Sequence, residues 1–356
     1  MIEQAPPADG GDIADVDSAT AGRGDDDRAT IRLRRYRRLA IITTAGVVLL
    51  TVAGGVVRLT GSGLGCDDWP NCNDTRFIDV SSGHTVIEQV NRLLSGVIGL
   101  PTLLLAIMAF LVRRPGLRWP ALGVLVSVLA NGVVGGLAVR GDLHPALVQS
   151  HFLLAMVSIA FGVIAVMRSG PIPIDRTQPN RSAPGSPGID SARPFALGGI
   201  VLAVASGAAL VTGTIVTGTG PHAGDEDVRR FGFDISNVAR THSVTVLVTL
   251  AIAIWLAWRV NRLSPRSPLA SSLSTWLFVG LLQGAIGYAQ YFNGVPELLV
   301  GVHIALAAGL WVLNVRLVVH ASTSTAGSEV VAVGGGLATD DAAVTRSFLG
   351  AESSRV

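Results

Sequence analysis

Three histidines in apolar surroundings are the residues of this sequence that point most directly to redox chemistry. His151, His242 and His303 lie inside or at the end of long apolar stretches, where a polar side chain is costly unless it faces the interior of a helix bundle. Two histidines on facing helices can supply both axial ligands of a haem iron, as in b-type cytochromes. The alternative is a histidine that only hydrogen-bonds a neighbouring helix. The pattern favours haem ligation by His242 and His303.

The first half of the chain carries a different set of polar residues. Asn91 stands where the second half has His242, and an asparagine is at best a poor ligand for iron. This half therefore offers iron one strong ligand, His151, and leaves the opposite face weakly filled, as in haems that react with oxygen. Glu88 lies three residues before Asn91, on the same helix face, where it could donate or accept a proton. An ion pair with Arg92, four residues later, is a compatible alternative.

Two cysteines, Cys66 and Cys72, lie in one polar connection. A close pair on the oxidising side of a membrane favours a disulfide that closes a small loop. A redox-active pair that exchanges with a thiol protein remains an alternative. A metal site there would need further ligands, of which His84 is the obvious one nearby.

Long apolar stretches must carry these residues. The chain has 356 residues, 49% hydrophobic and 15% charged, with a mean hydropathy of +0.52. Soluble domains carry about 25% charged residues, so this composition excludes a soluble enzyme and also a disordered chain. Eight stretches are long enough to cross a hydrocarbon core of ~30 Å as helices. They are Leu39–Val57, Val86–Val112, Pro120–Val139, Ala146–Met167, Phe195–Thr217, His242–Trp258, Ser272–Tyr291 and Leu298–His320.

The distribution of arginine predicts the topology. Arginines are concentrated before the first span and in the even-numbered connections, whereas the odd-numbered connections are mixed or acidic. The positive-inside rule then places both termini of a multi-pass plasma-membrane protein in the cytoplasm. We expect residues 1–38 and 321–356 to be disordered cytoplasmic segments. The stretch 169–194, rich in Pro, Ser and Gly, is expected to be a cytoplasmic linker.

The two halves of the chain resemble each other. Aligning spans one to four with spans five to eight pairs Asn91 with His242 and His151 with His303. The spacing within each half agrees, since Asn91 and His151 are 60 positions apart and His242 and His303 are 61 apart. The recurrence of histidine at paired positions strengthens the case for haem ligation. The predicted fold class is an all-α membrane protein, with eight transmembrane helices arranged as two tandem, parallel-repeat four-helix bundles over 39–168 and 195–320.

Several motifs together resemble the haem A synthase family of eight-span membrane proteins. The similarity runs from about Leu39 to His320, and its most specific motif is the first polar connection with the residues before it. The motifs are Gly54–Pro70 (GGVVRLTGSGLGCDDWP), Ile87–Arg92 (IEQVNR), Gln149–Ala155 (QSHFLLA), Thr217–Asp225 (TGTGPHAGD), Thr241-His242 and Val302–Ala305 (VHIA).

The resemblance implies an enzyme that oxidises a methyl group of haem o to the formyl group of haem a by successive oxygenations, with molecular oxygen as co-substrate. It implies a haem b ligated by His242 and His303, substrate haem o near His151, and Glu88 as the catalytic residue. The cysteine pair matches a pair found in one branch of the family. The family's usual motif has a histidine where this chain has Asn91. His151 therefore holds the substrate iron alone, or a rearranged ligand such as His144 or water helps.

The partners implied are membrane lipid, the farnesyltransferase that produces haem o, the terminal cytochrome oxidase pathway and an electron donor that the sequence does not identify. No nucleic acid is expected. Two other functions remain as alternatives: a b-type cytochrome that relays electrons without modifying haem, and a transporter suggested by the internal repeat. The relay would favour complete histidine pairs in both halves. A transporter should show broken helices and buried charge near the midplane, to which Asn131 and Gln283 are weak pointers.

Overall fold

The computed structural model describes residues 11–170 and 193–321, apart from residues 226, 264 and 266. Within these residues all regular secondary structure is helical, and eight helices are long and apolar enough to cross a membrane. This confirms the predicted all-α membrane class and the eight predicted spans. The helices are α1 (Gly11–Leu59), α2 (Gly83–Leu111), the 3-10 helix η1 (Pro115–Leu117), α3 (Arg118–Arg140), α4 (Pro145–Arg168), α5 (Arg193–Thr219), α6 (Ile235–Leu263), α7 (Pro268–Phe292) and an eighth helix (Glu297–Ala321).

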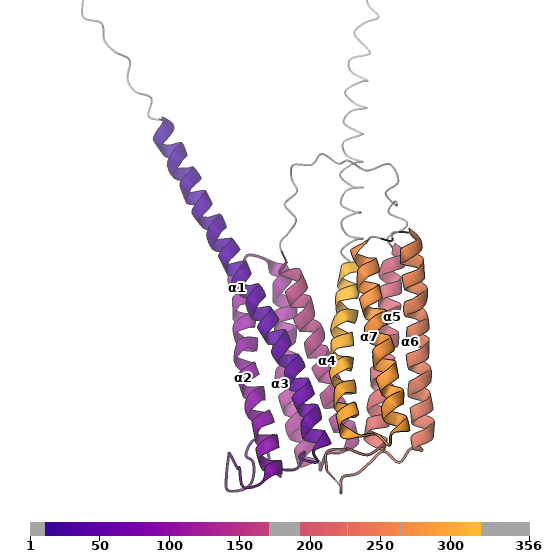
Figure 1. The fold of residues 1–356 in the computed structure, drawn as a ribbon. Helices are drawn as coiled ribbons and strands as arrows, with labels where there is room; N and C mark the ends of the chain where they lie inside the picture. The colour runs from indigo at the N-terminus through magenta and orange to yellow at the C-terminus, as the bar shows by residue number, and fades with distance from the viewer. Residues whose placement is uncertain (1–10, 171–192, 226, 264, 266, 322–356) are drawn as a thin grey trace, which may run out of the picture.

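The long helices stand side by side in two groups (Figure 1). In the first group α1, α2, α3 and α4 each contact two neighbours and close a ring, so α2 and α4 face each other across it. In the second group α6 lies between α5 and α7, and α5 also contacts α4 of the first group. Large apolar side chains such as Val204 and Phe278 are exposed on the spans, as a lipid environment requires. The tandem repeat itself stays a prediction.

Several helix starts are fixed by capping side chains. The Ser82 hydroxyl accepts a hydrogen bond from the Thr85 amide at the start of α2, and Ser267 caps α7 in the same way. Proline follows the cap at the first position of α4 and of α7, where its missing N–H costs nothing. These caps place the polar connections at the ends of the apolar spans.

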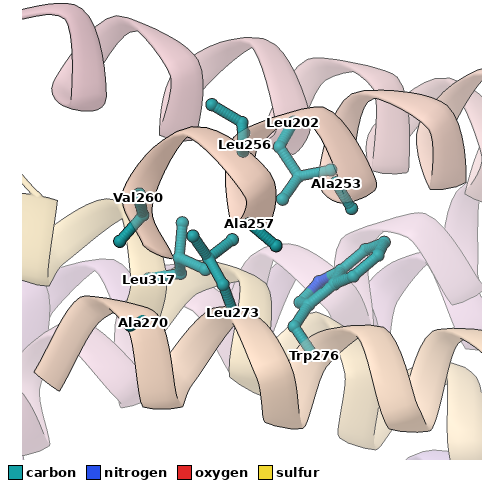
Figure 2. Close-up of a cluster of buried hydrophobic side chains, with 9 residues drawn as sticks. All are labelled: Leu202, Ala253, Leu256, Ala257, Val260, Ala270, Leu273, Trp276 and Leu317. Carbon is teal, nitrogen blue, oxygen red and sulfur yellow. The ribbon is translucent and has the colours of Figure 1, made fainter. Parts of the chain in front are cut away.

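The two ends of the helix groups differ in chemistry. The connections 60–82, 141–144, 220–234 and 293–296 lie at one end, the lower end in Figure 1, which we call the disulfide end because it carries Cys66 and Cys72. Towards the opposite end each group is filled by apolar side chains. In the second group these come from α5, α6, α7 and the eighth helix and point toward one another around Trp276 and Leu273 (Figure 2). In the first group Tyr36 and Leu105 lie in the corresponding cluster.

The two groups are joined along one seam. An apolar cluster of α1, α2, α4 and the eighth helix includes Val47, Ile159 and Ala308. Side-chain hydrogen bonds also join the groups: Trp311 Nε1 donates to the Met156 carbonyl at 2.8 Å, Gln149 Nε2 to Thr214 Oγ1 at 2.9 Å, and Arg58 Nη2 to the Thr217 carbonyl at 3.0 Å. The eighth helix therefore packs against the first group as well as against its own.

Two predicted boundaries differ from the structure. Residues 1–38 were expected to lack structure, but α1 begins at Gly11, because extending an established helix costs far less than nucleating one. Helix α6 begins at Ile235, seven residues before the start predicted at His242. Asp234 caps its first turn, since Asp234 Oδ1 accepts from the Asn237 amide at 2.8 Å. Residues 1–10, 322–356 and most of the expected linker, 171–192, lie outside the described residues.

Candidate functional site

His242 and His303 lie in the disulfide-end half of the second group. His242 is seven residues into α6, and His303 is six residues into the eighth helix. The two imidazoles are close enough to interact electrostatically. The structure thus brings together the two histidines that the sequence pairs as ligands.

Hydrogen bonds at Nδ1 orient two of the three histidines. His151 Nδ1 lies 3.1 Å from the Asn131 carbonyl, which can only accept, so Nδ1 carries the proton. His242 Nδ1 lies 3.1 Å from Thr212 Oγ1, a hydroxyl that also lies 3.0 Å from the Ala208 carbonyl and can donate there. His151 Nε2 therefore keeps its lone pair, and His242 Nε2 does so when the Thr212 hydroxyl donates to Ala208. This is the arrangement that second-shell groups impose on metal-ligating imidazoles. Among the described residues His303 Nδ1 has no hydrogen-bond partner.

Each histidine ring lies against a glycine of a neighbouring helix. A Cβ added at Gly213 of α5 would lie 3.0 Å from His242 Cε1, and one added at Gly287 of α7 would lie 3.2 Å from His303 Cε1. In the first group a Cβ at Gly135 of α3 would lie 2.9 Å from His151 Cε1. Sequence reasoning did not assign these glycines to the site. For two of them the sequence does contain a pattern: Gly135 and Gly287 each lie 16 residues before the histidine that they contact, His151 and His303.

The polar atoms around the histidines fit a bound group. Buried side-chain atoms without a hydrogen-bond partner include Asn91 Oδ1 and Asn131 Oδ1 in the first group and Gln283 Oε1 and Gln290 Oε1 in the second. Such atoms are rare in native proteins and mark places where a ligand or ordered water belongs. The described residues contain no cluster of three His, Cys, Asp or Glu side chains that could hold a metal ion. A metal that brings its own equatorial ligands, as haem iron does, fits this donor set, whereas a bare ion does not.

The first group offers a single histidine to such a metal. His151 projects from α4, while Asn91 lies on α2, across the ring of helices. His144 caps its own helix, since its Nδ1 accepts from the Ala146 amide at 3.3 Å. His84 is exposed and lies 3.0 Å from Ser62 Oγ. The structure therefore gives both of these histidines local partners.

Glu88 is the centre of a buried polar cluster that joins α2 to the disulfide loop. The residue is only 4% exposed. Oε2 accepts from the Cys66 amide at 2.6 Å, and Oε1 accepts from Arg92 Nη2 at 2.6 Å and Nε at 3.0 Å. Arg92 also donates to the carbonyls of Asp68 and Asn71, at 2.8 and 2.9 Å. The ion pair considered from the sequence is therefore present, and it also anchors a loop that the spacing alone did not reveal.

The disulfide loop covers the first group. Cys66 and Cys72 are joined in a disulfide, as the sequence predicted. The Trp69 ring packs so closely on Gly136 of α3 that a Cβ there would clash with it. Asp68 is held beside Arg140 of the same helix at 3.2 Å. The amide of Trp69 and the Arg140 guanidinium keep the pKa of Asp68 below its usual range.

The chain is similar to known proteins over most of its length. The COX15-CtaA family, described as cytochrome oxidase assembly protein, matches residues 37–315. A heme A synthase of Shouchella clausii (strain KSM-K16) is 27% identical over 288 residues, which cover 77% of this chain and 92% of that protein. Heme A synthases of Bacillus cereus (strain AH187) and Bacillus anthracis (strain A0248) are 33% identical over 130 residues. These shorter matches cover 36% of this chain and 42% of the length of each relative.

Proposed function

Because this chain belongs to the COX15-CtaA family of cytochrome oxidase assembly proteins, we propose that it is a haem A synthase, which oxidises a methyl group of haem o to the formyl group of haem a. The observation that carries the proposal is the family match over residues 37–315, which spans both helix groups. The unlike histidine sets of the two groups support it, since a relay cytochrome would favour a complete pair in each.

In this proposal the second group holds a resident haem b between His242 and His303. Iron with two histidine ligands is suited to electron transfer, which is the chemistry that this haem supplies when bound. Thr212 orients the His242 ring through Nδ1, and Gly213 and Gly287 leave room for the two rings. The electron donor is a partner still to be identified.

The first group is the proposed site for the substrate haem o. His151, oriented by the Asn131 carbonyl, is the ligand for the substrate iron. Asn91, opposite, is too weak a ligand to close the other face, which leaves a position for molecular oxygen as co-substrate. The loop that carries Trp69 covers this group and excludes water from it.

Glu88 is the proposed proton-transfer group of the first group. It is buried on the same helix face as Asn91, three residues away. To accept or release a proton it must exchange one of its present donors, the Cys66 amide or the Arg92 guanidinium, for a group of the substrate site. Its two roles, anchoring the loop and moving a proton, can be separated by mutation.

We place the protein in the plasma membrane with both termini in the cytoplasm. The arginines at the end opposite the disulfide end, such as Arg113, Arg114 and Arg168, support this orientation by the positive-inside rule. It also puts the Cys66–Cys72 disulfide on the oxidising side. The farnesyltransferase that makes haem o and the terminal cytochrome oxidase are the proposed pathway partners.

The test is expression in a host that makes haem o but no haem a, followed by chromatography of the extracted haems and pyridine haemochrome spectra. We expect haem a to appear with the wild-type chain. Haem b alone, with haem o unchanged despite a competent electron donor, would favour the relay cytochrome and contradict the proposal.

Two variants separate the roles of Glu88 in the same assay. Glu88→Gln keeps the shape and an acceptor for Cys66 but removes the charge, whereas Arg92→Gln weakens the loop anchor and keeps the carboxylate. We expect Glu88→Gln to lower haem a formation at least 100-fold, the range of general acid–base catalysis, and Arg92→Gln to lower it far less. Equal losses in the two variants would assign Glu88 to anchoring alone.

A further inference from the structure

Two half-buried arginines, Arg58 and Arg230, lie at the disulfide end. Arg58 lies in the last turn of α1 in the first group, and Arg230 lies in the connection between α5 and α6 of the second group. Phe231, the residue after Arg230, donates its amide hydrogen to the Gly218 carbonyl at 2.9 Å, and the Thr217 carbonyl beside it accepts from Arg58. The two arginines therefore lie near each other, and their charges repel. Arg58 Nη2 donates to the Thr217 carbonyl at 3.0 Å, so this first-group side chain reaches into the second group.

Among the residues that the structure describes, which do not include Glu226, neither arginine has an ion-pair partner. The ion pairs among the described residues join Arg76 to Asp79, Arg92 to Glu88 and Arg140 to Asp68, and none of them includes Arg58 or Arg230. Arg58 Nε and Arg230 Nη1 are buried without any hydrogen-bond acceptor within the part of the chain that the structure describes. Two neighbouring like charges that each bury an unsatisfied donor are unfavourable unless an anion lies between them.

The surroundings of the pair point to the haem-ligating helices of the second group. A Cβ added at Gly55 of α1 would lie 3.2 Å from Ile304 Cδ1, and one added at Gly301 would lie 3.3 Å from Leu59 Cδ1. The end of α1 therefore packs on the first turns of the eighth helix, next to His303. Thr217, which accepts from Arg58, lies on α5 near the end of the helix that carries the Gly213 contact with His242.

We propose that Arg58 and Arg230 together bind a carboxylate, the propionate of the porphyrin whose iron is held by His242 and His303. Guanidinium groups pair with carboxylates through two parallel, charge-assisted hydrogen bonds, and the two unsatisfied donors supply such bonds. Arg58 then makes the resident site of the second group depend on the first group. This inference rests on the proposed function, since it takes the ligand of the two histidines to be a haem.

Haemin and its dimethyl ester, which lacks the propionate charges, test the proposal. The full chain, purified from haem-depleted cells and placed in phosphatidylcholine nanodiscs, is titrated with each compound, and the low-spin Soret band gives Kd. We expect the wild-type chain to bind haemin at least tenfold more tightly than the ester, as charge-assisted hydrogen bonds imply.

Arg58→Gln and Arg230→Gln should each weaken haemin binding and leave ester binding nearly unchanged. Arg229→Gln, at the exposed neighbouring position, is the matched control and should bind like the wild type.

Several outcomes would overturn the proposal. Equal losses for haemin and ester would mean that the arginines only join the helix groups, and an unchanged preference in both variants would mean that they do not contact the propionate. An arginine effect that appears only in nanodiscs with phosphatidylglycerol would assign the pair to a lipid phosphate. Arg58→Lys, which keeps the charge, should retain most of the preference and so guards against a folding defect. A wild-type chain that binds neither compound with a low-spin spectrum would contradict the proposed function itself.

Discussion

The two helix groups have a similar arrangement of apolar side chains, histidines and glycines, and they differ at the position of Asn91 and His242. Both are filled by apolar side chains towards the end opposite the disulfide end, and both place a histidine against a glycine of the preceding helix: His151 on Gly135, and His303 on Gly287. Across the bundle, the second group adds His242 where the first has Asn91. The comparison teaches that the helical frame provides the space, while the number of histidines decides whether a site is suited to hold a haem or to react with one.

The polar connections at the disulfide end of the two groups also differ. The first group lies under a disulfide loop that is anchored by the buried Glu88–Arg92 pair. The second group lies under the connection 220–234, which brings in Arg230 and no cysteine. A buried carboxylate thus accompanies the single-histidine site, and two arginines without an ion pair among the described residues accompany the two-histidine site.

The largest expected effect comes from making the second group like the first. His242→Asn removes one of two strong iron ligands, so we expect low-spin haem per chain to fall more than tenfold, beyond the loss expected for an outer-shell partner. Optical spectra and haem-to-protein ratios of the purified chain measure this. Arg240→Gln, on an exposed position of the same turn, should keep the haem. Unchanged low-spin haem in His242→Asn would remove this residue from the ligand set.

The reciprocal change makes the first group like the second. Asn91→His offers a second strong ligand opposite His151, so we expect several-fold more haem to be retained per chain and a second low-spin component in the spectrum. The double variant Asn91→His, His151→Ala should lose this gain. A gain that survives the loss of His151 would show that the two positions do not share one iron.

The three site glycines should tolerate alanine poorly. Gly213→Ala, Gly287→Ala and Gly135→Ala each press a methyl group on a histidine ring at about 3 Å, and overpacking typically costs ~1–3 kcal/mol, or about 5- to 100-fold in haem affinity. Each has a control on its own helix with no atom near the added Cβ: Gly207, Gly284 and Gly132. Haem titration of the six variants measures the difference. Losses of similar size at the control positions would point to general helix effects instead.

The smallest effect is expected from the loop over the first group. Because the folded pKa of Asp68 is lowered by the Trp69 amide and by Arg140, its ionised form stabilises the fold above the unfolded pKa of about 3.9. This contribution is lost as the pH falls through the lower folded value. Thermal unfolding of the wild type and Asp68→Asn should therefore differ slightly at pH 6 and converge below about pH 4. A difference that persists at low pH would contradict the assignment.

The sequence predicted the parts of the fold that local patterns determine. Apolar length identified all eight spans, and the spacing of Glu88 and Arg92 indicated their ion pair. The predicted start of α6 was wrong because its first turns, which follow the capping residue Asp234, contain polar residues. Hydropathy detects only the apolar part of the helix. A single Asp–Asn spacing carries too little information to fix that boundary.

Contacts between distant residues were beyond the sequence. The glycine against each histidine ring, the Cys66 amide on Glu88 and the meeting of Arg58 with Arg230 join positions that are 16 to 172 residues apart. Each depends on which helices are neighbours, and this follows from packing and not from local composition. In a single sequence, the internal similarity of the two halves is the signal that bears on such pairs.

The division of labour between the two groups is the central claim, and one measurement tests it most directly. His151→Ala and His303→Ala are expressed in the host that makes haem o, and the haems bound to each purified chain are separated by chromatography. We predict that His151→Ala keeps haem b and loses haem o and haem a, whereas His303→Ala loses haem b. Loss of the same haem from both variants would contradict two distinct sites.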